Sequence, residues 1–143
     1  MTPQERAERS ADQMWSTDRA SQGLGMEIVR VGPGEAVLTM TVRDEFLNGH
    51  HICHGGYIFT LADSAFAFAC NTYNKIVVAQ ENTITFISPG KGGEVLTATA
   101  TEASRTGRSG VYDVVVTGED GRKVALFRGL SRQISGQHFE EEE

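Results

Sequence analysis

A chain of 143 residues, of which 39% are hydrophobic and 22% charged, has the size and composition of a single soluble globular domain. Its formal net charge of −6 argues against a protein that binds nucleic acid, whose surface needs a basic excess. No apolar segment is long enough to span a bilayer, and no charged-then-apolar leader begins the chain. We therefore expect a cytoplasmic protein without a membrane partner.

The first element that the sequence predicts is a helix from Pro3 to about Ser21. Thr2 and Glu5 have the spacing of a capping box, and proline is favoured at the first helical position. Glycines follow shortly afterwards and are expected to end this helix.

Two strands are expected next, over residues 26–31 and 36–43, with a Gly-Pro-Gly turn between them. In the second strand, apolar and polar side chains alternate with the period of two that a half-buried strand shows. A polar loop then leads to the most apolar segment of the chain, residues 55–71, which predicts a long central helix.

Four further strands are predicted at residues 77–87, 94–104, 110–117 and 122–134. The pair Asp120-Gly121 predicts a hairpin before the last strand, and we expect the four to follow one another as a meander. A helix as apolar as residues 55–71 must be covered, and one antiparallel sheet that curls round it does so. The predicted fold class is therefore α+β, with a central helix wrapped by about six strands and an additional N-terminal helix.

The domain is expected to span residues 1–135, because no linker or internal repeat divides the chain. The remaining residues, 136–143, end in four glutamates. We expect this acidic C-terminal tail to be disordered.

Asp63 carries the strongest functional signal. Histidines aside, it is the only formal charge between Glu45 and Lys75. Its helical neighbours three, four and seven positions away include four apolar residues: Phe59, Phe66, Ala67 and Cys70. A carboxylate on an apolar stripe is costly to bury and its pKa rises, so Asp63 is predicted to be a general base or a nucleophile. The alternative is a structural carboxylate bonded to a hydroxyl group.

A polar cluster stands at the start of the same helix. Asn48 and His54 precede Gly55 and Gly56, where the helix is expected to begin. The first N–H groups of a helix lack partners and carry the positive end of its dipole, and glycines let a carbonyl oxygen approach them closely. The pattern predicts an oxyanion hole for acyl transfer, with an ordinary helix-start turn as the alternative.

Other segments give weaker signals. The histidines and the cysteine of residues 50–54 match no zinc-binding pattern, so neither a metal nor another cofactor is predicted. Ser64 lacks the glycine-flanked elbow of a serine nucleophile. Residues 106–110 form a glycine turn whose N–H groups and guanidinium suit a phosphate, although a solvated hairpin is the default interpretation.

At this point the residues resemble a known family, the hotdog-fold acyl-CoA thioesterases, and they are closest to the PaaI-type thioesterases of bacterial phenylacetate degradation. The motifs that carry the resemblance are Leu47-Asn48-Gly49-His50, Cys53-His54-Gly55-Gly56 and Leu61-Ala62-Asp63-Ser64-Ala65-Phe66-Ala67, with Phe86, Pro89-Gly90, Gly110-Val111-Tyr112-Asp113 and Val124-Ala125-Leu126-Phe127-Arg128-Gly129. The resemblance extends over residues 24–134. It implies the hotdog fold, which is the helix-in-curled-sheet arrangement that the order of elements predicts independently.

The resemblance implies a role for each matching position. Asp63 attacks the thioester carbonyl or activates the water that does, while the Gly55 N–H holds the oxyanion. Asn48 binds the carbonyl or positions the water, and His54 contacts the thioester region. Family members are homodimers or dimers of dimers whose sites lie between subunits, so Asp63 is expected to face Asn48 and His54 of a second copy in a dimer or homotetramer.

Coenzyme A is part of the substrate in this family. The residues expected to contact it are Gly56, Phe86, Pro89, Lys91, Arg105, Gly107, Arg108, Ser109 and Gly110. Some relatives place a serine or threonine on the strand after the helix to share the water with the carboxylate. Here Ala79 aligns with that position, so the residue that assists Asp63 is left open.

Three functions are consistent with these residues. The first is hydrolysis of an aryl-acetyl-CoA, such as phenylacetyl-CoA or a ring-hydroxylated form, to the free acid and coenzyme A. The second is a hotdog module that binds acyl-CoA without cleaving it. The third is a hotdog hydratase or dehydratase.

Overall fold

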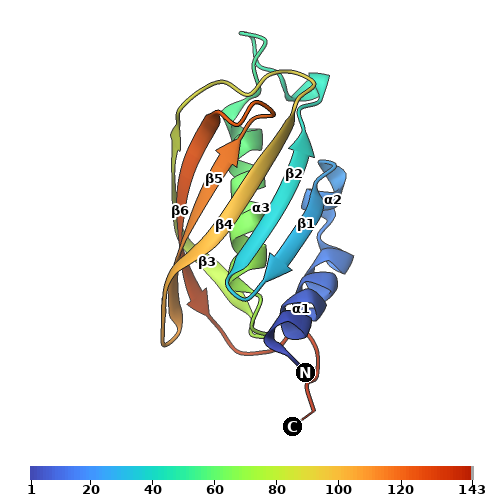
Figure 1. The fold of residues 1–143 in the computed structure, drawn as a ribbon, viewed down its shortest axis with the longest axis vertical. Helices are drawn as coiled ribbons and strands as arrows, with labels where there is room; N and C mark the ends of the chain where they lie inside the picture. Colours follow the sequence, from blue (N-terminus) through green and yellow to red (C-terminus); the bar gives the residue numbers. More distant parts are fainter. Residues whose placement is uncertain (143) are drawn as a thin grey trace.

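One long helix lies against the inner face of a curved, six-stranded antiparallel sheet in the computed structural model, which describes residues 1–142 (Figure 1). The elements are α1 (Pro3–Thr17), α2 (Arg19–Gly23), β1 (Glu27–Gly32), β2 (Glu35–Thr41), a 3₁₀ turn (Asp44–Phe46), α3 (Gly55–Cys70), β3 (Val77–Phe86), β4 (Val95–Thr106), β5 (Ser109–Thr117) and β6 (Lys123–Gln133). The predicted central helix, N-terminal helix and six strands are all present.

Helix α3 is the centre of the hydrophobic core. Its fully buried side chains include Leu61, Ala62, Ala65 and Phe66, and it packs against all six strands. Phe66 lies so close to Gly129 of β6 that a Cβ at that glycine would stand 2.7 Å from the ring. The sheet thus curls tightly over a helix that is apolar on most sides.

The order of strands in the sheet is β1-β2-β4-β5-β6-β3, which corrects the predicted four-strand meander. Strands β4, β5 and β6 do follow one another, but β3 pairs with β6, from Val77 opposite Gln133 to Phe86 opposite Ala125. The loop after β3 therefore crosses the end of the sheet to reach β4 beside β2 (Figure 1). This order places β1 and β3 at the two edges and covers both sides of α3.

The N-terminal helix is shorter than predicted. It ends at Thr17, and a separate short helix, α2, begins after Asp18. The Asp18 carboxylate accepts hydrogen bonds from the N–H of Ser21 at 3.0 Å and from its hydroxyl group at 2.7 Å. This side-chain cap competes with a continuous helix and turns the chain toward β1.

Residues 136–142 have a defined path, which corrects the expectation of a disordered tail; Glu143 lies outside the described residues. The Asn74 side chain accepts hydrogen bonds from the N–H groups of His138 and Phe139 and donates one to the Phe139 carbonyl. The ring of Phe139 is buried, and Glu141 forms an ion pair of 2.6 Å with Arg6 of α1. The acidic composition predicted disorder, but this apolar anchor and these partners fix the segment.

Within residues 1–142, no helix is long and apolar enough to cross a membrane. The same part of the chain contains no group of three or more His, Cys, Asp and Glu side chains with the arrangement of a metal site.

Candidate active site

His54 caps the N-terminus of α3. Its extended backbone ends the preceding loop, and its ring Nδ1 accepts a hydrogen bond of 2.9 Å from the Gly56 N–H. Because Nδ1 is an acceptor, the neutral ring carries its proton on Nε2. The cap thus fixes the tautomer and leaves an N–H donor on the outer side of the His54 ring.

The two glycines at the helix start are not equivalent. Gly56 donates its N–H to His54, which corrects the expectation that both glycine N–H groups are available. The Gly55 N–H has no hydrogen-bond acceptor within the described chain, and it lies at the positive end of the helix dipole. Of the predicted pair of oxyanion donors, Gly55 is the one free to bind a ligand oxygen.

A cavity of about 430 Å³ lies at this helix start. It is lined by Asn48, Ile52, Cys53, Gly55, Ile58, Phe86, Ile87, Ser88 and Pro89. The Asn48 side-chain oxygen accepts hydrogen bonds from the N–H groups of His50 and Ile52, while its NH₂ group has no partner among residues 1–142. The structure thus brings together Asn48, Gly55, Phe86 and Pro89 of the predicted site, with two free N–H donors in a mostly apolar cavity.

Cys53 also lines this cavity, and its thiol is buried. Burial, and to a smaller extent the charge of Glu94, raise the pKa of its thiol to about 11. The thiol is therefore protonated near neutral pH, and a protonated thiol is a poor nucleophile.

Asp63 lies eight residues further along α3, which is about 12 Å from Gly55 at the rise of an α-helix. Its carboxylate accepts a hydrogen bond of 2.8 Å from the side-chain NH₂ of Asn82 on β3. Burial raises the pKa of Asp63, and the bond from Asn82 partly offsets that rise. The structure therefore places Asp63 away from Asn48 and His54 of its own chain.

Asn82 is a site residue that the sequence did not single out. It lies in the strand segment where the resemblance pointed to Ala79, but a bulge between Ala79 and Glu81 shifts the register of β3 against β6. The alternation of side chains along a strand changes at a bulge. The partner of Asp63 is therefore Asn82 rather than the residue at position 79.

Ser64, next to Asp63, has a structural contact. Its hydroxyl lies 2.8 Å from the hydroxyl of Ser21, which in turn donates to Asp18. This chain of hydrogen bonds ties α2 to α3.

Known proteins are similar to this chain in sequence. A family model described as the thioesterase superfamily matches residues 50–125. The acyl-coenzyme A thioesterase PaaI of Escherichia coli is 44% identical over 131 residues, which are 92% of this chain and 94% of that protein. This chain belongs to the thioesterase superfamily.

Solved structures of the superfamily agree with the fold. The Escherichia coli PaaI protein from the phenylacetic acid degradation operon superimposes with a TM-score of 0.93 at 43% identity, over 95% of this chain and 99% of that one. A mutant structure of the phenylacetic acid degradation protein PaaI from Thermus thermophilus gives 0.79 at 37% identity, over 82% and 100% of the two chains. A Streptococcus mutans protein bound to acetyl-CoA gives 0.75 at 26% identity, over 78% and 90%. The predicted hotdog thioesterase fold and PaaI-type membership are confirmed.

The basic turn expected to contact coenzyme A lies at the other end of this thioesterase domain. It is the two-residue hairpin between β4 and β5, with Gly107 at φ +61°, and its residues line a small pocket together with Cys70 at the end of α3. The Arg105 guanidinium stacks 3.6 Å above the Tyr73 ring, whereas Arg108 forms no ion pair among residues 1–142. In a single chain, Arg105, Gly107, Arg108, Ser109 and Gly110 are therefore separated from Gly55 by the length of α3.

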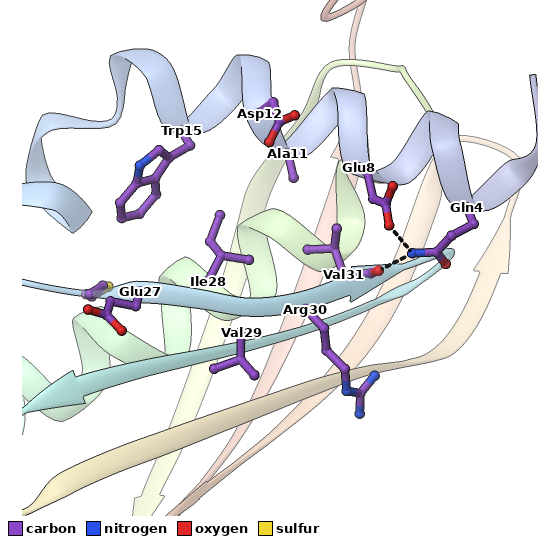
Figure 2. Close-up of a pocket in the computed structure, with 11 residues that line it drawn as sticks. Gln4, Glu8, Ala11, Asp12, Trp15, Glu27, Ile28, Val29, Arg30 and Val31 are labelled. Atoms are coloured by element: carbon purple, nitrogen blue, oxygen red, sulfur yellow. Dashed lines mark hydrogen bonds between the residues drawn. The ribbon is translucent and has the colours of Figure 1, made fainter.

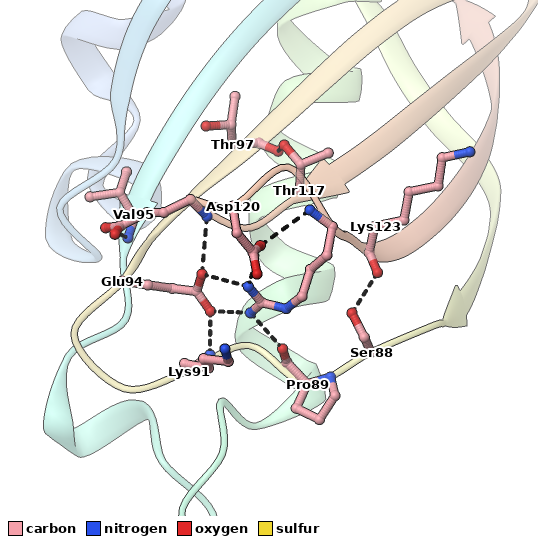
Figure 3. Close-up of polar contacts among 11 residues, drawn as sticks. Ser88, Pro89, Lys91, Glu94, Val95, Thr97, Thr117, Asp120 and Lys123 are labelled. Carbon is pink, nitrogen blue, oxygen red and sulfur yellow. Dashed lines mark hydrogen bonds and ion pairs between the residues drawn. The ribbon is translucent and has the colours of Figure 1, made fainter.

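The loop that carries Pro89 and Lys91 is held by an ion-pair network (Figure 3). Glu94 pairs with Arg122 and accepts the N–H groups of Lys91 and Glu119, and Arg122 also donates to the Pro89 carbonyl at 2.8 Å. Burial acts to raise the pKa of Glu94, but these hydrogen bonds lower it below its usual value. Arg122 thus holds the Pro89 segment in the wall of the cavity.

A second cavity, of about 550 Å³, lies between α1 and the edge strand β1 (Figure 2). The Gln4 side chain of α1 donates hydrogen bonds to the Val31 carbonyl of β1 at 2.7 Å and to Glu8 of α1 at 3.0 Å. Asp12, Trp15 and Ile28 also line it. None of the predicted site residues contributes to this larger cavity, so the smaller one at Gly55 is the candidate active site.

Proposed function

We propose that this thioesterase hydrolyses an acyl-CoA whose acyl group is an aryl-acetyl group, such as phenylacetyl or a ring-hydroxylated form. The observation that carries the proposal is the free Gly55 N–H at the start of α3, beside the free NH₂ of Asn48 in one cavity. Hydrogen-bond donors are what a thioester carbonyl needs as negative charge develops on its oxygen.

The substrate class is supported by the relatives. Escherichia coli PaaI is named an acyl-coenzyme A thioesterase, and its structure is described as belonging to the phenylacetic acid degradation operon. The lining of the cavity by Ile52, Ile58 and Phe86 suits an apolar acyl group. The thioester then lies with its carbonyl oxygen at Gly55 and its carbon exposed to attack.

Two routes through Asp63 complete the reaction. As a general base, Asp63 takes a proton from water while the water oxygen bonds to the carbonyl carbon; the tetrahedral intermediate collapses, the C–S bond breaks and the thiolate of coenzyme A is protonated. As a nucleophile, Asp63 itself displaces the thiolate and forms a mixed anhydride, which water hydrolyses. Both routes need Asp63 ionised and close to Gly55.

A second copy of the chain brings an Asp63 carboxylate close to Gly55. Within one chain Asp63 is about 12 Å from Gly55, and β3, which carries Asn82, is an edge strand with one unpaired side. This strand exposes apolar side chains, which include Val78 and Phe86. Proteins normally cover such an edge. Pairing of two β3 strands in a dimer, or in a dimer of dimers, sets Asp63 of one copy opposite Asn48 and His54 of the other.

The phosphates of coenzyme A fit the same assembly. Arg108 is free of ion pairs among the described residues, and Lys91 is exposed beside the cavity. Since Arg108 is separated from Gly55 in its own chain, a second copy is also needed for both to contact one coenzyme A molecule.

The proposed function is tested by measuring the release of free thiol from phenylacetyl-CoA and from a panel of other aromatic and aliphatic acyl-CoAs. Faster release from the aryl-acetyl members supports the proposal. Binding without thiol release identifies the non-catalytic module, and hydration of an unsaturated acyl-CoA without thiol release identifies the hydratase.

A further inference from the structure

We propose that Asn82 is the positioning residue for Asp63: its amide holds one carboxylate oxygen, keeps the group ionised, and leaves the other oxygen for the reaction. The inference rests on the proposed function, in which Asp63 acts as base or nucleophile. It concerns a residue of this chain that the motifs did not mark, on the strand opposite the helix that carries Asp63.

The contact is specific and has a defined direction. The Asn82 NH₂ donates to Oδ1 of Asp63 at 2.8 Å, so an amide proton lies on the oxygen that faces β3. A hydrogen bond to one oxygen of a carboxylate fixes the rotation of the group about its last bond. Because no other side-chain partner holds Asp63 among residues 1–142, Asn82 alone sets which oxygen points away from the strand.

The amide of Asn82 has no other use. Its carbonyl oxygen is buried and has no hydrogen-bond partner among the described residues, which is a cost to folding that an apolar side chain of similar size would avoid. Asn71 provides the contrast, since its amide bonds to the backbone of Ala67 and Val77 and serves as a structural clamp. A half-satisfied amide whose one contact is the catalytic carboxylate is explained by that contact.

Among the described residues, no charged side chain adds to the influence of Asn82 on the pKa of Asp63. Burial and the bond from Asn82 are the two influences on the pKa of Asp63. The Cys70 thiol, about two helical turns away on α3, has a pKa of about 12 and remains neutral. Glu81 on β3 is exposed, since neighbouring side chains of a strand point to opposite faces. Arg128 on β6 is also exposed and pairs with Asp113.

In the proposed dimer, His54 of the second copy is the other titratable group at the site. A substitution at Asn82 leaves His54 in place. The difference in pH profile between the wild type and an Asn82 variant therefore reports the effect on Asp63. Removing a donor to an ionised carboxylate raises its pKa. The acid limb of kcat/KM, which reports the free enzyme, then moves to higher pH.

The test uses Asn82→Leu and Asn82→Asp, each close to asparagine in size, in the full chain. We expect Asn82→Leu to move the acid limb upward by about one pH unit and to lower the plateau kcat by about tenfold. Its Tm should equal or exceed that of the wild type, because an unsatisfied buried oxygen is gone. Asn82→Asp should move the acid limb upward as well, because a second carboxylate opposes ionisation of the first.

A control and a reference variant separate this inference from the function itself. Thr117→Val removes a side-chain donor from β5 that bonds to the Thr97 carbonyl and not to Asp63, and should leave the pH profile unchanged. Asp63→Asn tests the proposed function. If Asp63→Asn is inactive while Asn82→Leu and Asn82→Asp keep the wild-type acid limb and kcat, the role of Asn82 is refuted and the function stands. If Asp63→Asn is fully active, the function assigned to Asp63 is refuted first. Should Asn82→Leu fail to fold, the acid limb of Asn82→Asp decides.

Discussion

The ring of Phe86 lies directly against Gly55, so that a Cβ at position 55 would stand 2.9 Å from the ring carbon Cζ. The end of β3 is therefore in contact with the start of α3, at the one N–H of the glycine pair that is free to bind an oxyanion. Phe86 is 52% exposed, which means that this ring can be displaced by a small side chain at Gly55.

This contact gives the first prediction. Gly55→Ala should lower kcat by about tenfold, because displacement of Phe86 shifts the substrate relative to the N–H. Phe86→Ala should mainly raise KM, since it removes apolar lining. The double variant should be more active than the product of the two single effects, because the clash is absent. Steady-state kinetics of the four proteins measure the coupling, and strictly additive effects would show that the two residues act independently.

The second prediction concerns the charge of Asp63. Asp63→Asn should lower kcat by several orders of magnitude, since an amide is neither a base nor a nucleophile. Its Tm should not fall, because burial raises the pKa of Asp63 and the ionised group therefore opposes folding. Turnover and thermal unfolding are measured on the same sample. A variant that keeps a tenth or more of the wild-type kcat would rule out Asp63 as the reacting carboxylate.

The third prediction concerns assembly. If a second copy completes the site, the active species should have a mass of twice or four times 15.5 kDa, measured by light scattering at assay concentrations. Val78→Glu on the exposed edge of β3 should favour the monomer, because a charge on an edge strand opposes strand pairing, and should abolish turnover with it. A monomer with full specific activity would contradict the proposed arrangement.

The fourth prediction uses the two arginines of the basic turn. Arg108→Ala should raise KM for the full acyl-CoA but not for a short pantetheine thioester, because phosphate binding far from the reacting bond acts mainly on KM. Arg105→Ala is the matched control: its guanidinium is stacked on Tyr73, so the change should act on stability more than on KM. Equal KM values for the wild type and Arg108→Ala on both substrates would remove Arg108 from the binding site.

The fifth prediction follows from the Glu94–Arg122 network. Since hydrogen bonds lower the pKa of Glu94 in the folded chain, its contribution to stability is present above the unfolded pKa of about 4.3 and is lost as the pH falls through the lower folded pKa. Glu94→Gln should reduce the free energy of unfolding by about 2 kcal/mol at pH 7. The difference from the wild type should shrink below about pH 4. Urea unfolding at both pH values measures it, and a difference that is the same at both would show that the charge of Glu94 is not what stabilises the loop.

The sequence by itself determined the class of fold and the chemistry-bearing residues. The apolar run of α3 requires a cover on all sides, and the periods of the flanking segments predict strands, so a sheet curled round a helix follows from local patterns. A single carboxylate in that run, and two glycines at its start, mark the site because burial and helix termini change the properties of charges and N–H groups wherever they occur.

Only the tertiary structure decided which of these groups meet. Hydrogen-bond pairing between distant strands put β3 beside β6 instead of β4, and a bulge in β3 brought Asn82, not Ala79, to Asp63. The anchoring of residues 138–141 on Asn74 and Arg6 depends on side chains that reach across loops. Local pattern fixes what a segment is, because it depends on near neighbours in the chain, whereas register and long-range contacts depend on how all the segments pack at once.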